Sequence, residues 1–469
     1  MKNKIMKKII DEKFLWGGSS SAYQIEGGWN ADGKEPSVQD VKTYIPAGTT
    51  DFKVASDHYH HWKEDVKMMS EAGFRSYRFS ISWTRVWSFK NNQPNQPGIK
   101  FYNDLIDELI KYKIEPIITM YHFDLPDFLQ QQGGWLSRST IDEFAKYAQL
   151  LVENFGHKVK YWLTINEQNM MALVPEAVLG QKATMKDIYQ CNHHMFLAQA
   201  KAMKIVHQLS KSLVGPAPNI NVIYPNTNTP DDYLAAINCA NIRNWYYLDL
   251  PIFGKYNTIV LDLLEKNNSM FDIEKGDMEI LTDPLAKPDF IAFNYYATGT
   301  VKSSDENNAV ASKGGDQHSK SGVKGYFEQV KNPNLAKTQF GWEIDPVGFK
   351  TTMLELTTRY NLPLILTENG IGGYDELDAN NEINDQYRID YYTAHFKQMF
   401  EAMEMGVDLI GYNPWSAIDL VSTHEGIKKR YGFIFVNRTE DDLKDLKRYP
   451  KKSFYWYKEV IKNNGKNIK

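Results

Sequence analysis

Cysteine is scarce in this sequence. Cys191 and Cys239 are the only two among 469 residues, and both lie in stretches that we expect to be helical. So few cysteines exclude the disulfide framework of a small secreted domain and favour a reducing compartment. The basic segment 1–12 agrees, because Ile9 and Ile10 are followed at once by charged residues and form no signal-peptide core. We therefore expect a cytoplasmic protein.

Long apolar runs and an excess of one charge are also missing. No run approaches the roughly 20 apolar residues that a membrane-spanning helix needs. The 54 basic and 58 acidic side chains give a net charge of -4, which provides no broad positive field for nucleic acid. We therefore expect neither a membrane nor a nucleic-acid partner, and the oligomeric state stays open.

Aromatic residues, in contrast, are plentiful at 13% of the chain, with 11 Trp and 28 Tyr. Flat rings in a pocket suit sugars, whose C–H faces stack on them while the hydroxyl groups form hydrogen bonds. The length of 469 residues fits one large α/β barrel with loop insertions. We predict a single catalytic domain over 1–469, with an N-terminal extension at 1–12 and a mobile surface loop at 303–333, where Ser, Lys, Asn and Gly are concentrated.

Eight apolar runs with strand character recur along the chain, and segments with helical periodicity lie between many of them. One such segment carries Phe101, Leu105, Ile106, Leu109 and Ile110 at helical spacing. Strands that alternate with helices argue for a parallel sheet, and a count of eight favours a closed (β/α)8, or TIM, barrel. The eight runs are 14–17, 74–81, 114–121, 159–165, 220–224, 290–295, 362–367 and 409–412.

Two short motifs place a carboxylate beside an asparagine directly after an apolar run, at Asn166-Glu167 and at Glu368-Asn369. Two convergent carboxylates are what hydrolysis of a glycosidic bond needs, because one protonates the leaving oxygen while the other attacks the anomeric carbon or activates a water. In a barrel, chemistry is built from the C-terminal ends of the strands, where both motifs fall. Further candidates near such ends are Arg78, His122, Tyr296 and Trp415.

Several motifs in order along the chain resemble those of glycoside hydrolase family 1, the retaining β-glycosidases, from about residue 14 to the C-terminus. The resemblance implies a (β/α)8 barrel and a double displacement that needs no cofactor and no metal. The motifs are Phe-Leu-Trp-Gly at 14–17 with Gln-Ile-Glu-Gly at 24–27, Tyr-Arg-Phe-Ser-Ile-Ser-Trp at 77–83, Tyr-His-Phe-Asp-Leu-Pro at 121–126, Asn-Glu at 166–167, Asn-Tyr-Tyr at 294–296, Thr-Glu-Asn-Gly at 367–370 and Pro-Trp-Ser at 414–416.

The resemblance implies a role for each candidate in the barrel. Glu167 is expected to be the general acid and base, and Glu368 the nucleophile that forms a covalent glycosyl-enzyme. Arg78 would keep Glu368 ionised, because a nearby guanidinium favours the carboxylate form. Tyr296 would donate a hydrogen bond to the same carboxylate, and Asn166 would bind the sugar 2-hydroxyl. The implied sugar-binding residues are Gln24, His122 and Trp415 for the glycone and Trp342 for the aglycone.

The stretch 419–433 carries the most specific information about the substrate. In family members that act on unmodified sugars, the position of Ser422 resembles a Glu that binds the 4- and 6-hydroxyls. A Glu there would repel a phosphate on O6 by about 4 kcal/mol, for unit charges ~4 Å apart at an effective dielectric near 20, and serine removes this repulsion. Ser422, Lys429 and Tyr431 resemble the phosphate clamp of the 6-phospho-β-glycosidases. We therefore expect the partner to be a small phosphorylated β-glucoside.

The sequence leaves other functions open. The 6-phospho-β-galactosidases carry a Trp directly after the serine, so Thr423 favours the gluco branch, and an ordinary β-glucosidase for neutral sugars differs only in the clamp. A non-catalytic sugar-binding barrel is disfavoured, because both carboxylates are present. The histidines of 57–61 and 193–194 prompt a metal-dependent hydrolase, but the first cluster precedes apolar residues at helical spacing and is expected to begin a helix outside the barrel. The natural aglycone is not specified.

Overall fold

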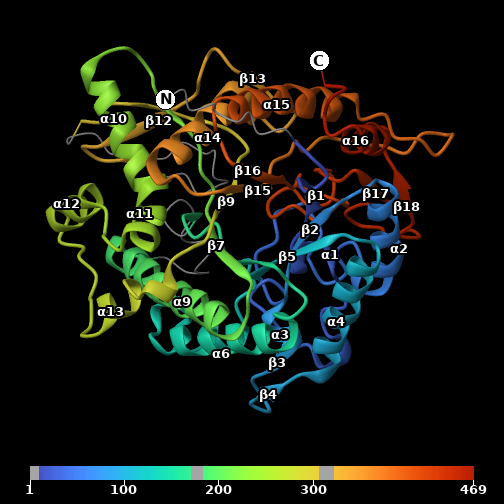
Figure 1. Ribbon diagram of the computed structural model, residues 1–469, viewed down its shortest axis with the longest axis horizontal. Helices are drawn as coiled ribbons and strands as arrows, with labels where there is room; N and C mark the ends of the chain where they lie inside the picture. The colour runs from blue at the N-terminus through green and yellow to red at the C-terminus, as the bar shows by residue number, and fades with distance from the viewer. Residues whose placement is uncertain (1–9, 171–182, 306–321, 469) are drawn as a thin grey trace, which may run out of the picture.

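The computed structural model describes residues 10–170, 183–305 and 322–468, and a parallel sheet of eight strands forms its centre (Figure 1). The ends of this sheet meet, because the N–H of Asn294 donates to the carbonyl of Pro218 at 3.0 Å and the N–H of Asp289 donates to that of Val214 at 2.9 Å. The sheet thus closes into a barrel, which confirms the predicted fold class. In sheet order the strands are β7 (Leu213–Ala217), β6 (Tyr161–Asn166), β5 (Glu115–Tyr121), β2 (Ser76–Ser80), β1 (Leu15–Ser19), β16 (Leu409–Tyr412), β15 (Leu364–Glu368) and β9 (Ile291–Asn294).

Helices surround the barrel, as Figure 1 shows, and their apolar faces pack on the strands. In α4 (Gln96–Lys111), Phe101, Leu105, Ile106 and Leu109 are buried as their spacing predicted, whereas Ile110 is 43% exposed. The other crossover helices are α2 (His58–Glu71), α6 (Ser139–Phe155), α9 (Met185–Leu209), α10 (Pro230–Ala240), α11 (Tyr246–Phe253), α12 (Thr258–Lys266), α13 (Asp277–Leu281), α14 (Pro346–Tyr360), α15 (Gln386–Glu404) and α16 (Lys452–Lys462).

Strand side chains alternate between two apolar clusters, as the period of two in a strand requires. On β5, Ile118 joins the large cluster between strands and helices, while Ile117 belongs to a small cluster inside the barrel. The inner cluster draws one or two side chains from each of six barrel strands or their flanks, so the barrel is a packed core at this level. Its buried members are Leu15, Ile117, Tyr161, Leu163, Ala217, Phe290, Ala292 and Ile365.

The predicted position of the fifth barrel strand was wrong. The barrel uses Leu213–Ala217, whereas the predicted run 220–224 lies just beyond it and contributes to β8 (Ile223–Pro225). The strand reads Leu-Val-Gly-Pro-Ala, and both glycine and proline count against a strand interior. Gly215 is tolerated because the carbonyl oxygen of Phe290 would stand 2.4 Å from an added Cβ, so the close approach of β9 leaves room only for glycine.

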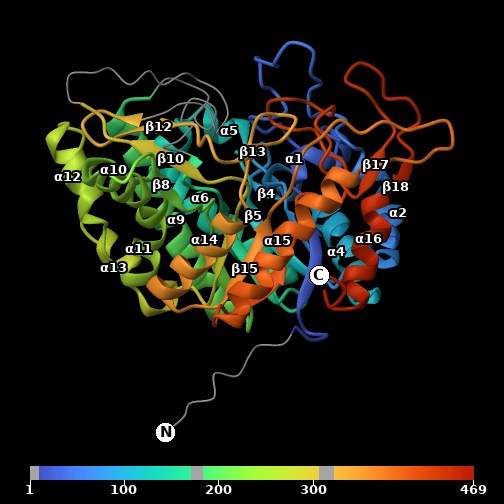
Figure 2. The ribbon, with the colours of Figure 1, turned by 90° about the horizontal axis from the view of Figure 1, so that it is seen from above.

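An accessory sheet beside the barrel corrects the prediction for 303–333. Residues 306–321 lie outside the described residues, but β11 (Gly322–Val323) and β12 (Phe327–Val330) are strands within the predicted loop. β11 pairs with β12, β12 pairs with β10 (Gly299–Lys302), and β10 pairs in turn with β8. Figure 2 places β10 and β12 along the same edge of the molecule as α1 (Ala22–Ile25) and α5 (Asp127–Gln130), which follow the C-terminal ends of β1 and β5.

The described part of the N-terminal extension packs on the barrel. Ile10 is buried, and Nη1 of Arg75 donates to the carbonyl oxygen of Asp11 at 3.0 Å. Of the helices in the described ranges, none is both long and apolar enough to cross a membrane. The remaining elements are short and lie in the loops: α3 (Trp83–Val86), β3 (Trp87–Ser88) with β4 (Gln93–Pro94), β13 (Ala336–Lys337) with β14 (Glu343–Ile344), and β17 (Ile434–Val436) with β18 (Arg448–Pro450).

Candidate active site

Both candidate carboxylates lie where a barrel strand loses its regular pairing. The register between β15 and β9 shifts between Leu366 and Glu368, and that between β6 and β7 shifts between Leu163 and Asn166. Such irregularities re-aim side chains and are common beside active sites. Glu167 also has a φ of 42°, a left-handed conformation that costs a non-glycine residue about 1 kcal/mol or more. The fold therefore sets the direction of both side chains, and at Glu167 it does so with a strained backbone.

One pocket of about 140 Å³ is lined by both carboxylates and by most of the predicted sugar-binding residues. Arg78, Asn166 and Lys429 do not line it but contact residues that do. Lys42, Tyr23 and Glu425 line it and were not predicted. The predicted residues on its wall are Gln24, His122, Glu167, Tyr296, Trp342, Glu368, Trp415, Ser422 and Tyr431.

Glu368 is held by a cation and a phenol. Nη1 of the fully buried Arg78 lies 2.5 Å from Oε1 of Glu368, and the hydroxyl of Tyr296 donates to Oε2 at 2.7 Å. The guanidinium is fixed in turn, because its Nε donates to Oγ1 of Thr119 at 2.8 Å and its Nη2 donates to Oδ1 of Asn166 at 2.6 Å. Both carboxylate oxygens thus have donors, an arrangement that stabilises the charged form.

Glu167 is held by amides instead of a direct cation. Nδ2 of Asn219 and Nδ2 of Asn294 donate to its Oε1 at 2.9 and 3.0 Å. Nη2 of Arg243 donates to Oδ1 of Asn219 at 2.8 Å and so orients that amide. Nδ2 of Asn294 also donates to Oδ1 of Asn166 at 3.1 Å, and this links the two carboxyl groups through Asn166 and Arg78.

The protonation of the pair follows from burial and from these partners. Burial raises the pKa of Glu368 to about 7 although Arg78 lowers it, and Glu167 raises it further. Burial also raises the pKa of Glu167, opposed by the hydrogen bonds from Asn294 and Asn219. The pair therefore holds a proton at higher pH than isolated carboxyl groups would. We place the charge on Glu368 and the proton on Glu167, because Arg78 and Tyr296 contact Glu368 directly.

His122 lines the pocket as a neutral imidazole whose tautomer is set by Asn166. Because Oδ1 of Asn166 accepts hydrogen bonds, its Nδ2 is the donor that lies 3.2 Å from Nε2 of His122. The proton of His122 is thereby assigned to Nδ1, a buried atom without a hydrogen-bond partner among the described residues. Burial, together with the charge of Arg78, holds the pKa of His122 well below its usual range. Its ring stacks on Trp415 at 5.8 Å and 15°.

Gln24 lies on the same wall of the pocket. Its Nε2 donates to the carbonyl oxygen of Val421 at 2.9 Å, and its Oε1 accepts from Ser21 at 2.7 Å. The hydroxyls of Tyr23 and Thr423 lie 3.1 Å apart beside it. These contacts join the N-terminal and C-terminal ends of the chain at the pocket.

The predicted clamp residues come together, but around an additional carboxylate. Oγ of Ser422 donates to Oε2 of Glu425 at 3.2 Å, and Nζ of Lys429 lies 3.4 Å from the same oxygen. Nζ of Lys429 also lies 3.8 Å from the ring centroid of Trp342, close enough for a cation–π contact. Tyr431 lies on the pocket wall. Sequence reasoning missed Glu425, although it stands among the clamp residues.

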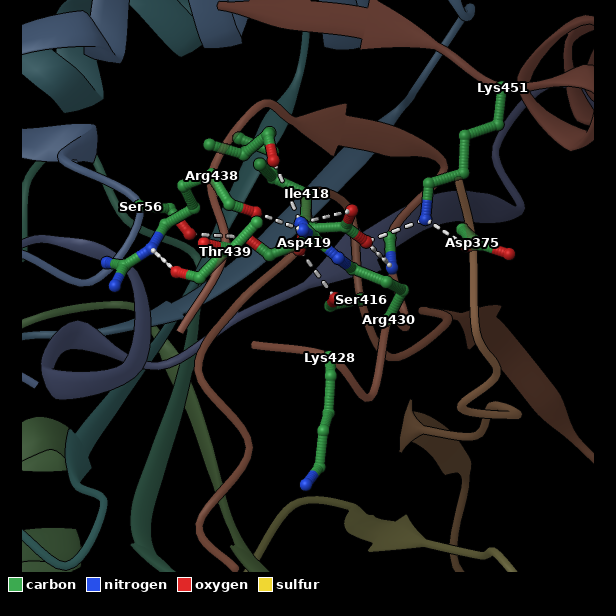
Figure 3. Close-up of polar contacts among 12 residues, drawn as sticks. Ser56, Asp375, Ser416, Ile418, Asp419, Lys428, Arg430, Arg438, Thr439 and Lys451 are labelled. Carbon is green, nitrogen blue, oxygen red and sulfur yellow. Dashed lines mark hydrogen bonds and ion pairs between the residues drawn. The ribbon is translucent and has the colours of Figure 1, made fainter. Parts of the chain in front are cut away.

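A buried ion network holds Asp419 and Arg430, which belong to the same stretch as the clamp residues (Figure 3). Nη1 of Arg430 lies 3.2 Å from Oδ2 of Asp419, and Nζ of Lys451 bridges Oδ1 of Asp419 at 2.7 Å and Oδ2 of Asp375 at 2.6 Å. Lys428 points away from this network in Figure 3. Of the three consecutive basic residues, only Lys429 therefore reaches the clamp.

The two histidine clusters serve structure. His58 begins α2 as expected, and its Nδ1 lies 2.7 Å from Oδ2 of Asp65. His193 contacts Asp277 at 2.8 Å, and Nδ1 of His194 lies 2.9 Å from the carbonyl oxygen of Trp135. Across the described ranges no cluster of three or more His, Cys, Asp or Glu side chains is arranged to hold a metal ion.

Comparison with known proteins agrees with this geometry. Residues 6–466 match the model of glycosyl hydrolase family 1. An aryl-phospho-β-D-glucosidase of Bacillus subtilis (strain 168) is 43% identical over 97% of this chain and 98% of its own, and a 6-phospho-β-glucosidase of Clostridium longisporum is 36% identical over the same shares. The solved structure of a family 1 β-glucosidase from Thermotoga maritima is similar with a TM-score of 0.87 at 33% identity, covering 98% of this chain and 99% of that one. The chain belongs to glycosyl hydrolase family 1.

Proposed function

We propose that this protein hydrolyses 6-phospho-β-D-glucosides to glucose 6-phosphate and an aglycone, with retention at the anomeric carbon. The observation that carries the proposal is one pocket lined by Glu167 and Glu368 and also by Ser422 and Tyr431. The hydroxyl of Ser422, with Lys429 nearby, can bind a phosphate, whereas a glutamate at position 422 would repel it. Several relatives similar over nearly the whole chain carry the names 6-phospho-β-glucosidase or phospho-cellobiase.

The first step breaks the glycosidic bond. The carboxylate of Glu368 attacks the anomeric carbon while Glu167 gives its proton to the leaving oxygen, and a covalent glycosyl ester forms as the aglycone departs. Each oxygen of the Glu368 carboxylate has one donor, Arg78 at Oε1 and Tyr296 at Oε2, and these contacts fix the carboxylate for the attack. Charge leaves Glu368 in this step, and the buried guanidinium of Arg78 remains to stabilise the carboxylate when it is released.

The second step returns the enzyme to its starting state. Glu167, now ionised, takes a proton from a water that attacks the same carbon, and Glu368 leaves as a carboxylate. Two displacements at one carbon give net retention. His122 and Gln24 bind ring hydroxyls, and Asn166, already fixed by Arg78 and Asn294, binds the 2-hydroxyl.

A panel of three chromogenic substrates tests the proposal: p-nitrophenyl β-glucoside, its 6-phosphate, and the galacto 6-phosphate. We expect kcat/KM to be largest for the gluco 6-phosphate, by about 100-fold or more over the neutral glucoside, because charge-assisted contacts to phosphate contribute about 3 kcal/mol. Comparable rates on the first two substrates would end the phosphate assignment. A larger rate on the galacto 6-phosphate would move the protein to the galactosidase branch.

A further inference from the structure

Glu425, a carboxylate in the described part of the chain, contacts two of the three residues assigned above to the phosphate clamp. Its Oε2 accepts from Oγ of Ser422 at 3.2 Å and lies 3.4 Å from Nζ of Lys429. A phosphate oxygen bound by this clamp would need the same two donors. The carboxylate therefore stands in the place of the phosphate in the ligand-free protein.

The position of Glu425 also separates Lys429 from the pocket. Glu425 lines the pocket, whereas Lys429 is only 1% exposed and does not. The carboxylate thus covers the ammonium group on the pocket side, and Trp342 lies 3.8 Å from the same nitrogen. A substrate phosphate that binds Nζ of Lys429 in the position of Oε2 therefore requires Glu425 to move.

The turn that carries Glu425 allows this movement. Ser422 and Gly426 pair through two backbone hydrogen bonds, of 2.9 and 3.3 Å, which hold the turn while leaving the side chain of Glu425 free to rotate. That side chain is 26% exposed, in contrast to the buried Lys429, so it has solvent to rotate into. The backbone can stay in place as the carboxylate leaves.

We propose that Glu425 is a specificity-determining residue, an internal anion that occupies the phosphate position and is displaced by the substrate. This inference rests on the proposed function. A dianionic phosphate offers Lys429 and Ser422 stronger contacts than one carboxylate and replaces it, whereas an uncharged 6-hydroxyl does not. The carboxylate lowers the affinity for every anion at this position, so free inorganic phosphate competes poorly and the full substrate, bound also through its sugar, is favoured.

Glu425→Gln tests the inference, because it removes the charge and keeps the size of the side chain. We expect kcat/KM for p-nitrophenyl β-glucoside 6-phosphate to rise about three- to tenfold, more than any change on the neutral glucoside. Inorganic phosphate should also inhibit the variant at concentrations about three- to tenfold lower. Glu64→Gln is the matched control, since Glu64 is exposed on α2 and makes the same change in net charge outside the pocket.

The opposite results overturn the inference. If Glu425→Gln lowers kcat/KM only on the phosphorylated substrate, the carboxylate holds Lys429 in position. If it lowers kcat/KM equally on both substrates, the carboxylate binds the sugar. No change on either substrate would also refute it. Lys429→Ala distinguishes failure of this inference from failure of the proposed function. If Lys429→Ala loses the preference for the phosphorylated substrate and Glu425→Gln changes nothing, only the present inference is rejected. If Lys429→Ala keeps that preference, the phosphate clamp itself is rejected.

Discussion

Arg78 and Glu368 form a buried ion pair with Nη1 and Oε1 2.5 Å apart, and the same guanidinium donates to Asn166 at 2.6 Å. Residues 78, 166 and 368 come from three barrel strands or their ends. One cation thus sets the charge of the proposed nucleophile and the direction of the amide proposed to bind the 2-hydroxyl.

Replacing the nucleophile should abolish turnover. Glu368→Gln keeps the shape and the hydrogen bond from Tyr296 but removes the attacking charge, so we expect kcat to fall by about 10⁴-fold or more. Steady-state rates with the 6-phosphate of p-nitrophenyl β-glucoside measure this. A variant that keeps more than about a hundredth of the activity would show that Glu368 is not the nucleophile.

The effect of replacing the proposed acid, Glu167, should depend on the leaving group of the substrate. Glu167→Gln cannot protonate the departing oxygen, so kcat/KM for substrates with an alkyl or sugar aglycone should fall by about 10²- to 10⁴-fold. For a 2,4-dinitrophenyl substrate it should fall far less, because 2,4-dinitrophenolate leaves without a proton. The measurement is the dependence of kcat/KM on leaving-group pKa in the variant and in the wild type. An equal loss across the series would assign Glu167 a different role.

The acidic limb of the pH profile should report on Arg78. Glu368 must be ionised to attack, so activity is lost as pH falls through its pKa, which burial raises to about 7. Arg78 lowers this pKa, and Arg78→Met should therefore move the acidic limb of kcat/KM to higher pH by about 1 unit or more. Arg78→Lys keeps the charge and should move it less. A shift to lower pH would contradict the ion-pair argument.

A glutamate introduced at 422 should reverse the preference for phosphate. Ser422→Glu places a second negative charge beside Glu425 and opposite the phosphate, so we expect kcat/KM on the phosphorylated substrate to fall by up to about 10³-fold. The neutral glucoside should lose little or gain. Ser422→Ala is the control, because it removes the hydroxyl without adding charge. Its kcat/KM on the phosphorylated substrate should fall by about tenfold.

Asp419 should be critical for stability. Its Oδ1 accepts from the N–H of Gly432 at 2.9 Å and from Lys451, and its Oδ2 faces Arg430. Asp419→Asn leaves two buried cations poorly paired, and we expect the free energy of unfolding to drop by about 3–5 kcal/mol. Urea unfolding measures this. Asp104→Asn, which breaks an exposed pair with Lys100, should leave the unfolding midpoint unchanged.

Local sequence was enough to predict that Glu167 and Glu368 lie close together, and the family resemblance supplied most of the other predicted pocket residues. Glu167 and Glu368 end apolar strands, and strand ends converge in a barrel, so the pattern carries the geometry. The fifth strand escaped prediction because Gly215 and Pro216 weaken its pattern, while the neighbouring run 220–224 is more apolar. The register shift before Glu368 likewise has no local signal.

Residues that act through others were harder to predict. Asn219 and Arg243 orient Glu167 from far along the chain, and polar side chains in loops give no sign of such contacts. Glu425 was present in the clamp stretch, but its contacts depend on the turn between Ser422 and Gly426. The role proposed for it therefore depends on the three-dimensional structure.

The hydrogen bond from Gln24 to Val421 joins positions 397 residues apart, and Tyr23 meets Thr423 across 400. A growing polypeptide on the ribosome thus has no complete sugar pocket until nearly all of it has been made. Fragments that end before residue 415 lack Trp415 and the clamp residues, so catalysis is expected only when synthesis is almost finished. Because such contacts join distant parts of the sequence, folding is expected to be slow.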